Sequence, residues 1–210
     1  MTDYRVSHSA SDYGRVYDRT YEFGYYRAQW EKVERPLLER LFERYRAEGA
    51  SRYLDFACGT GRILEVGSRY FPVTYGVDVS DSMLVQARAR CPNVTLLRQD
   101  LTREPLVERF HLATAFRFFL NAEPELRRDA VAAIWACLEP GGRLLANVHV
   151  NRSSVLGLAY RIRNRVKGTT VAKVLGLEEL RSVLETRGFV IEETFWYSYL
   201  PRPGWRFSRL

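Results

Sequence analysis

The fold class of this chain is decided by Leu54-Asp55-Phe56-Ala57-Cys58-Gly59-Thr60-Gly61-Arg62, where an apolar run passes into a glycine loop and then into a helical pattern. Gly59 and Gly61 allow a tight turn that can approach a ligand closely. A dinucleotide-binding G-x-G-x-x-G fingerprint would need glycine where Leu64 stands. Asp55 is also an acid inside the strand, which would repel a pyrophosphate. The loop therefore favours a ligand with a positive amino group over a nicotinamide dinucleotide.

Apolar runs alternate with helical patterns on both sides of this loop. The predicted strands are residues 53–57, 73–77, 94–97, 112–116 and 144–150. The predicted helices between and after them are residues 62–70, 82–90, 124–138 and 177–186, followed by a β-rich run at 189–200. Strands that alternate with helices predict right-handed βαβ units and a parallel sheet covered on both faces. The predicted fold is therefore α/β and doubly wound.

The N-terminal segment has a different composition from the rest. Residues 1–30 interleave aromatic with charged side chains, whereas a disordered tail would be poor in aromatics. Apolar positions recur at helical spacing over residues 30–48, and Gly49 ends this pattern. We predict two parts: a helical lid segment at residues 1–48 and a main domain at 49–210.

Length and composition narrow the class of protein. The chain has 210 residues, of which 46% are hydrophobic and 27% charged, which is enough for a core of its own. No apolar run approaches the roughly 20 residues of a membrane span. Polar residues occupy the place of a signal peptide's apolar core: Ser9, Asp12, Arg15 and Asp18. Three scattered cysteines disfavour disulfides and a structural metal, so we expect a cytoplasmic protein.

Four motifs, in the correct order, resemble those of class I S-adenosylmethionine-dependent methyltransferases. Residues 55–61 resemble the first motif, with Ala57 in place of the usual opening glycine. Asp78 and Asp100 follow at the ends of the second and third predicted strands, and residues 138–143 resemble the LxPGG turn before the fifth. The resemblance covers residues 50–200. It implies a Rossmann-like, seven-stranded, mostly parallel sheet with an antiparallel last strand, and S-adenosyl-L-methionine as cofactor.

The resemblance also implies roles for single residues. In the family, the acid matching Asp78 accepts hydrogen bonds from the ribose hydroxyls, and the motif matching Asp100 reaches the adenine. Phe116 is expected near the methionine part of the cofactor. The predicted cofactor-binding residues are Tyr17, Asp55, Ala57, Gly59, Gly61, Asp78, Val79, Met83, Asp100, Leu101 and Phe116. The alternative for Asp78 and Asp100 is that they cap a turn or helix.

Candidate catalytic residues are His149, Arg117 and Tyr21. Methyl transfer from a sulfonium depends mainly on alignment, and a base is needed only if the acceptor loses a proton early. His149 has the pKa range of a base, or it is a hydrogen-bonded core residue. Arg117 either holds an acidic acceptor or forms a surface ion pair. Tyr21 is expected in the lid, together with Tyr13, Tyr17 and Arg27.

The positive charge gathers in one segment. The formal net charge is +7, and no acid lies between Glu139 and Glu178. Seven cations lie there: Arg143, Arg152, Arg161, Arg163, Arg165, Lys167 and Lys173. In the family this region forms a substrate cap, here residues 151–173. Three interpretations are open: a solvated helix face, a clamp for an anionic or phosphorylated metabolite, or a contact with a membrane surface or nucleic acid through residues 152–167.

These observations predict an enzyme that methylates a small-molecule acceptor at oxygen or nitrogen, with anionic metabolites among the candidates. The run at residues 116–121 departs from the family's motif for methylating DNA bases or glutamine. Two alternatives stay open: an RNA methyltransferase, and a non-catalytic S-adenosylmethionine-binding partner subunit. The absence of an OB, KH or RRM signature disfavours nucleic acid. The sequence does not determine the oligomeric state.

Overall fold

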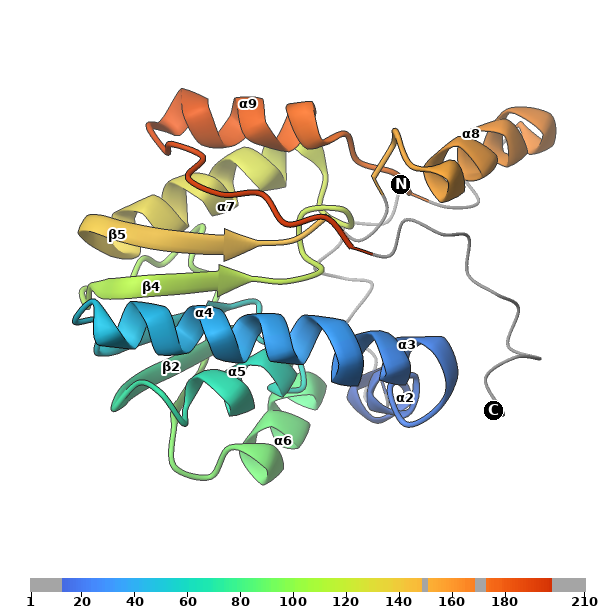
Figure 1. Ribbon diagram of the computed structural model, residues 1–210. Coiled ribbons are helices and arrows are strands. Elements are labelled where there is room, and N and C mark those ends of the chain that lie inside the picture. The colour runs from blue at the N-terminus through green and yellow to red at the C-terminus, as the bar shows by residue number, and fades with distance from the viewer. Residues whose placement is uncertain (1–12, 149–150, 169–172, 198–210) are drawn as a thin grey trace.

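A five-stranded parallel sheet forms the centre of the protein (Figure 1). The computed structural model describes residues 13–148, 151–168 and 173–197. The strands are β1 Arg52–Phe56, β2 Val73–Asp78, β3 Thr95–Arg98, β4 Phe110–Ala115 and β5 Leu138–Ala146. Their order is β3-β2-β1-β4-β5, so the direction of the winding reverses between β1 and β4. The predicted Rossmann-like α/β class is confirmed.

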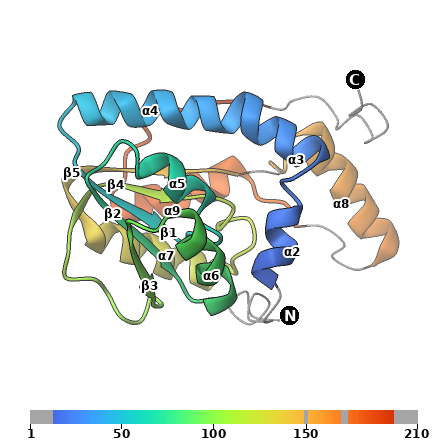
Figure 2. The ribbon, with the colours of Figure 1, turned by 90° about the horizontal axis from the view of Figure 1, so that it is seen from below.

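Helices cover both faces of the sheet (Figures 1 and 2). One hydrophobic cluster joins Tyr53 and Leu112 to α4 Arg35–Ala47, α5 Arg62–Gly67 and α6 Asp81–Arg90. The other joins their chain neighbours, Leu54 and Ala113, to α7 Pro124–Cys137 and α9 Leu177–Arg187. Successive side chains on a strand point to opposite faces, so the nearly unbroken apolar runs of β1 and β4 fill both clusters.

The N-terminal helices are more extensive than the predicted helix over residues 30–48. They are α2 Tyr13–Arg19, α3 Gly24–Gln29, the π-helical turn η1 Trp30–Glu34, and α4, which follows η1 directly. Gln29 precedes η1 and donates from Nε2 to Glu34 Oε1 at 2.7 Å, across five residues. Both side chains are buried, and Glu34 is the residue directly before α4. π-helical turns are rare and often occur at functional sites.

The expectation of seven strands with an antiparallel last strand is wrong for the described part of the chain. Residues 189–197 form no strand, and residues 198–200 of the predicted run lie outside the description. The segment runs beside β5 (Figure 1) and is held there by side chains. The rings of Phe189 and Trp135 meet edge-on, with their centroids 4.9 Å apart. Glu192 Oε2 lies 3.0 Å from Arg143 Nε. Strand propensity alone does not make a strand without a backbone partner.

The boundaries of β5 also differ from the prediction. The strand begins at Leu138, directly after α7, and ends at Ala146, whereas residues 144–150 were predicted. Residues 149 and 150 of the predicted strand lie outside the described residues. The Gly141–Gly142 pair lies within β5, and Gly141 has a left-handed φ of 78°. Among the described helices, none combines the length and the apolarity that crossing a bilayer requires.

Candidate functional site

A cavity of about 650 Å³ lies at the carboxyl ends of the central strands. Open α/β sheets bind ligands at this edge, where the strand order reverses. Most of the predicted site residues line it: Tyr17, Tyr21, Asp55, Ala57, Gly59, Asp78, Val79, Met83, Asp100, Leu101, Phe116 and Arg117. The fold thus brings together side chains from the lid, the glycine loop and the ends of four strands.

Two predicted site residues are not part of this lining. Gly61 instead packs against α6: an added Cβ would lie 3.1 Å from the Cβ of Ala87, and its φ of 79° is left-handed. Both the packing against α6 and the left-handed backbone therefore require glycine at position 61. His149 lies outside the described residues, so its role as a base stays a prediction.

A larger hollow, about 1670 Å³, lies beside β5. Its walls are α4, β5, the start of α9 and residues 188–197, the flank where a sixth strand was expected. Phe116 borders both spaces, but the glycine loop, Asp55, Asp78 and Asp100 border only the smaller one. The chemistry of the motifs therefore identifies the smaller cavity as the candidate site.

Asp78 connects the glycine loop to the loop after β2. Its Oδ2 accepts from the backbone N–H of Gly59 at 2.8 Å, and its Oδ1 accepts from that of Ser80 at 2.8 Å. Gly59 has a φ of 57°, and nothing lies within 4 Å of where a Cβ would stand. Ala57 adopts the same left-handed region, with a φ of 54°. Alanine thus replaces the family's glycine at the cost of backbone strain.

Asp100 has the geometry of a turn cap. Its Oδ1 accepts from the backbone N–H of Thr102 at 3.0 Å and from the Thr102 hydroxyl at 2.6 Å. Asp78 makes the equivalent bond to Ser80, so the capping alternative holds for both acids. Capping does not exclude ligand binding, since each carboxylate can accept about four hydrogen bonds.

Asp55 is buried within β1. It lies opposite Thr114 of β4 in the sheet register, and its Oδ1 accepts from the Thr114 hydroxyl at 2.6 Å. Its other oxygen, Oδ2, is buried and has no hydrogen-bond partner among the described residues. Burial raises the pKa of this carboxyl to about 7, although the Thr114 hydrogen bond works in the opposite direction.

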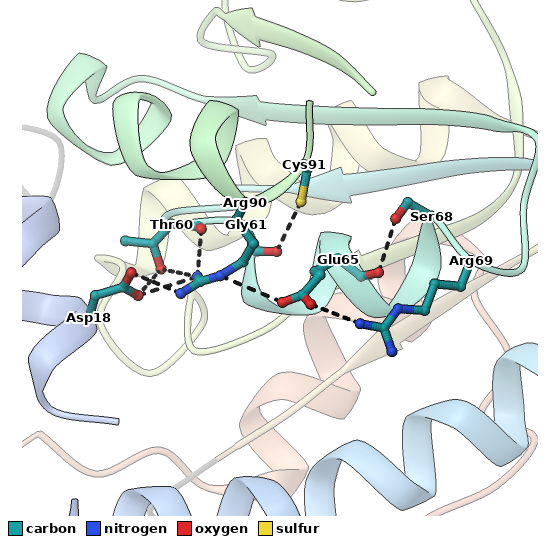
Figure 3. Close-up of polar contacts among 8 residues, drawn as sticks. All are labelled: Asp18, Thr60, Gly61, Glu65, Ser68, Arg69, Arg90 and Cys91. Carbon is teal, nitrogen blue, oxygen red and sulfur yellow. Dashed lines mark hydrogen bonds and ion pairs between the residues drawn. The ribbon is translucent and has the colours of Figure 1, made fainter. Parts of the chain in front are cut away.

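Helix α2 of the predicted lid segment is attached to the glycine loop by a polar contact that the sequence did not reveal (Figure 3). Asp18 of α2 pairs with Arg90 of α6 at 2.9 Å and accepts from the Thr60 hydroxyl at 2.7 Å. Arg90 also donates to the backbone carbonyl of Thr60 at 2.7 Å. An added Cβ on Gly14 would lie only 2.3 Å from the Ser82 carbonyl, so α2 packs closely on the start of α6.

Arg117 forms a buried ion pair with Glu34, not a surface one. Its Nη2 lies 3.2 Å from Glu34 Oε1. Its backbone has a left-handed φ of 59°, and its N–H donates to Asn147 Oδ1 at 2.7 Å. Glu34 was not predicted as a site residue. The available signal was its place on the apolar stripe of the N-terminal helix, between Trp30 and Leu38.

Tyr21 covers two guanidinium groups. Its ring centroid lies 3.7 Å from Arg62 Cζ and 5.1 Å from Arg117 Cζ, and its hydroxyl pairs with that of Tyr17 at 3.3 Å. Burial raises the pKa of Tyr21 far above its usual range, so the phenol stays protonated. Arg27 is expected beside Tyr21, but its side chain is exposed. It pairs instead with Glu31, four residues further along the chain, at 2.9 Å. The side chain of Tyr13 is not described.

The basic segment forms a helix outside the cavity. This is α8 Val155–Lys167, which projects from the sheet (Figure 1). Its cations Arg161, Arg163 and Arg165 are exposed and are not among the residues that line the cavity. From the predicted cap, Lys173 does line it and donates to the Asn121 carbonyl. The three interpretations of α8 remain predictions. The cations that line the cavity are Arg62, Arg117 and Lys173.

Comparison with known proteins agrees with this geometry. Residues 54–142 match a family described as methyltransferase domain. Over these residues the chain therefore resembles the methyltransferase domain of the class I S-adenosylmethionine-dependent methyltransferases. Within this range lie the glycine loop, Asp78, Asp100 and residues 138–142, which form the start of β5, so the resemblance in motifs is confirmed.

Three similar proteins are themselves named as methyltransferases. A dTDP-3-amino-3,4,6-trideoxy-α-D-glucopyranose N,N-dimethyltransferase of Streptomyces venezuelae is 38% identical over 47% of this chain and 43% of its own. A malonyl-[acyl-carrier protein] O-methyltransferase of Bacillus cereus is 33% identical over 46% and 38%. The structure of S-adenosylmethionine-bound CalS10, an amino pentose methyltransferase of Micromonospora echinaspora, superposes with a TM-score of 0.53 and 33% identity, over 62% and 55%. The chain spans less than half the length of the two curated relatives.

The contact between Asp18 and Arg90 predicts how firmly helix α2 is held against the rest of the protein. Asp18→Asn keeps the size of the side chain but removes its charge. We expect trypsin to cleave after Arg15 and Arg19 about fivefold faster, equivalent to about 1 kcal/mol for a partly exposed pair. Glu22→Gln, which neutralises an exposed acid of the same segment, is the control and should leave the rate unchanged. Equal rates for Asp18→Asn and wild type would contradict the contact.

The burial of Asp55 predicts a pH-dependent stability. Its folded pKa is raised from 3.8 to about 7, so the folded state favours the protonated acid. The stability from this group is complete below pH 3.8 and is lost as the pH rises through about 7. Asp55→Asn cannot ionise. Urea unfolding should therefore show the free energy of unfolding of Asp55→Asn rising relative to wild type between about pH 4 and 7, and a difference independent of pH would refute the assignment.

Proposed function

We propose that this protein transfers a methyl group from S-adenosylmethionine to an oxygen or nitrogen of a small-molecule acceptor. The observation that carries the proposal is the cavity itself. Three carboxylates, Asp55, Asp78 and Asp100, surround one glycine loop at the carboxyl edge of the sheet, under a lid of tyrosines. The match of residues 54–142 to a methyltransferase domain supports the same conclusion.

The residues present fit such a cofactor. The buried, unpartnered Oδ2 of Asp55 suits the ammonium group of the methionine part, and the open space above Gly59 allows close approach of a ligand to the loop. Asp78 would hold the ribose hydroxyls. Asp100 and Leu101, with Val79 and Met83, would enclose the adenine. When bound, S-adenosylmethionine supplies a methyl group on a positively charged sulfur, which is already a good leaving group.

The work left to this chain is mainly to orient the acceptor and to exclude water. The aromatic lid of Tyr17, Tyr21 and Tyr26 lies over the cavity, and such rings attract cations. Because Tyr21 stays protonated, it serves as a wall or a hydrogen-bond donor and not as a base. His149 remains the proposed base, for acceptors that must lose a proton. Residues 1–48 form the proposed lid, and residues 49–210 the proposed main domain.

The similar proteins narrow the acceptor class. Two are named for amino sugars and one for a malonyl group on a carrier protein, which supports a small-molecule acceptor and leaves oxygen and nitrogen open. An RNA methyltransferase and a non-catalytic cofactor-binding subunit are the alternatives that the following experiments separate.

The first experiment measures cofactor affinity. Asp78→Ala should weaken S-adenosylhomocysteine binding in calorimetry by about 1.5–3 kcal/mol, the range for hydrogen bonds to a charged group. Asp81→Ala is the matched control, since the Asp81 side chain is 59% exposed and lies only three residues away. Similar affinities for the two variants would show that Asp78 does not bind the cofactor.

The second experiment measures turnover. The protein is incubated with methyl-labelled S-adenosylmethionine and a fractionated cell extract, and the labelled product is identified by mass spectrometry. We expect label in a small-molecule fraction, with none for Gly59→Arg, whose side chain fills the loop. Label in RNA favours the RNA alternative. Binding of S-adenosylhomocysteine without labelling of any fraction favours the partner subunit.

A further inference from the structure

Two arginines that line the cavity, Arg62 and Arg117, are buried together with Glu34, which borders the larger hollow. Glu34 lies 3.2 Å from Arg117 Nη2 and 3.7 Å from Arg62 Nη1. The side chains of both arginines are 10% exposed, and that of Glu34 is 1% exposed. Within this group of three side chains, two positive charges face one negative charge, which leaves a surplus of one positive charge.

The carboxylate of Glu34 is already occupied by the protein. Besides the arginines, it accepts from Gln29 Nε2 at 2.7 Å and from the Tyr197 hydroxyl at 3.4 Å. Glu34 carries one negative charge, so it cannot neutralise both guanidinium groups. The surplus charge is not removed by its nearest acid.

The arginines, in contrast, have unused donors. Nε and Nη1 of Arg62 and Nε of Arg117 are buried and have no hydrogen-bond partner among the described residues. The guanidinium of Arg62 lies between the rings of Tyr21 and Trp30, at 3.7 and 4.5 Å from their centroids. Aromatic faces attract the cation but leave the N–H groups in its plane free. Buried charged donors without partners are costly unless a ligand completes the site.

The position of Arg117 is maintained against backbone strain. Its left-handed φ of 59° is uncommon for a residue with a side chain. Two amide side chains hold it: Asn147 accepts from its N–H at 2.7 Å, and Asn121 donates to its carbonyl at 2.8 Å. Arg117 lies two residues beyond the end of β4 and lines the same cavity as the glycine loop. Strain that the surroundings enforce is typical of functional positions.

We propose that Arg62 and Arg117 form a binding site for a carboxylate group of the methyl acceptor. The inference rests on the proposed function and specifies its substrate class: a small carboxylic acid with the accepting oxygen or nitrogen nearby. A carboxylate carries one negative charge and matches the surplus, whereas a phosphate monoester carries between one and two. The planar fork of each guanidinium suits the two carboxylate oxygens. Glu34, held by Gln29 and Tyr197, positions both arginines.

The experiment uses benzoate and its neutral isostere benzamide as probes of the protein saturated with S-adenosylhomocysteine. Calorimetry or ligand-observed NMR should show that wild type binds benzoate at least about tenfold more tightly than benzamide. Arg117→Gln should abolish this preference and change S-adenosylhomocysteine affinity less than about twofold. Arg69→Gln, an exposed arginine of the loop after α5, is the control and should keep the preference.

A second variant tests the charge count. Glu34→Gln keeps the side-chain volume and raises the surplus from one positive charge to two. The ratio of phenyl phosphate affinity to benzoate affinity should then be at least about tenfold higher in Glu34→Gln than in wild type. This measurement does not depend on Arg117→Gln. If one of the two variants fails to fold, the other still tests the proposal.

Several results would overturn the proposal. These are a wild type without preference for benzoate, a preference that survives in Arg117→Gln, and an unchanged ratio in Glu34→Gln. A tenfold loss of S-adenosylhomocysteine affinity in Arg117→Gln would assign the arginines to the cofactor's own carboxylate instead. If wild type does not bind S-adenosylhomocysteine at all, the proposed function fails. The benzoate preference, measured without it, then still tests the anion site.

Discussion

The buried carboxylate of Glu34 connects the segments that enclose the cavity. It reaches Arg62 at the start of α5, Arg117 after β4 and Tyr197 near the end of the described chain, while its own backbone belongs to the N-terminal helices. Burying a carboxylate without partners would be prohibitive, and removing one partner of a buried pair typically costs about 3–5 kcal/mol. The N-terminal helices and the sheet are therefore coupled through one charged group.

Parallel strands bring the acids of the site together. Asp55 on β1, Asp78 at the end of β2 and Asp100 after β3 are separated by more than twenty residues each, yet they line one cavity. Because every strand points the same way, every carboxyl end meets at one edge, and the reversal of strand order beside β1 opens space there. The cavity is lined by three acids and by Arg62 and Arg117, a combination that suits a ligand with both charges or two ligands of opposite charge.

Local patterns predicted most of the fold and failed where a partner was needed. The five strands and the helices between them follow from apolar runs and helical periodicity, which each segment carries in its own residues. The run at 189–197 has the composition of a strand, but becomes one only with a hydrogen-bonded neighbour. Side chains hold it in place instead: Glu192 contacts Arg143 of β5, and Phe189 contacts Trp135 of α7. Asp18, Arg90 and Glu34 escaped prediction for the same reason, since the ion-pair partners of Asp18 and Glu34 lie 28 to 83 residues away.

The sequence by itself determined the fold class, the glycine loop and the acids at the strand ends, because turn chemistry and strand alternation act over a few neighbouring residues. Only the tertiary structure decided that Arg117 faces Glu34 and Tyr21, that Arg27 faces solvent, and that the cations of α8 lie outside the cavity. The composition of a charged segment does not say which charges become buried. Burial is settled when distant elements pack, and a charge excluded from water then acquires partners or a ligand.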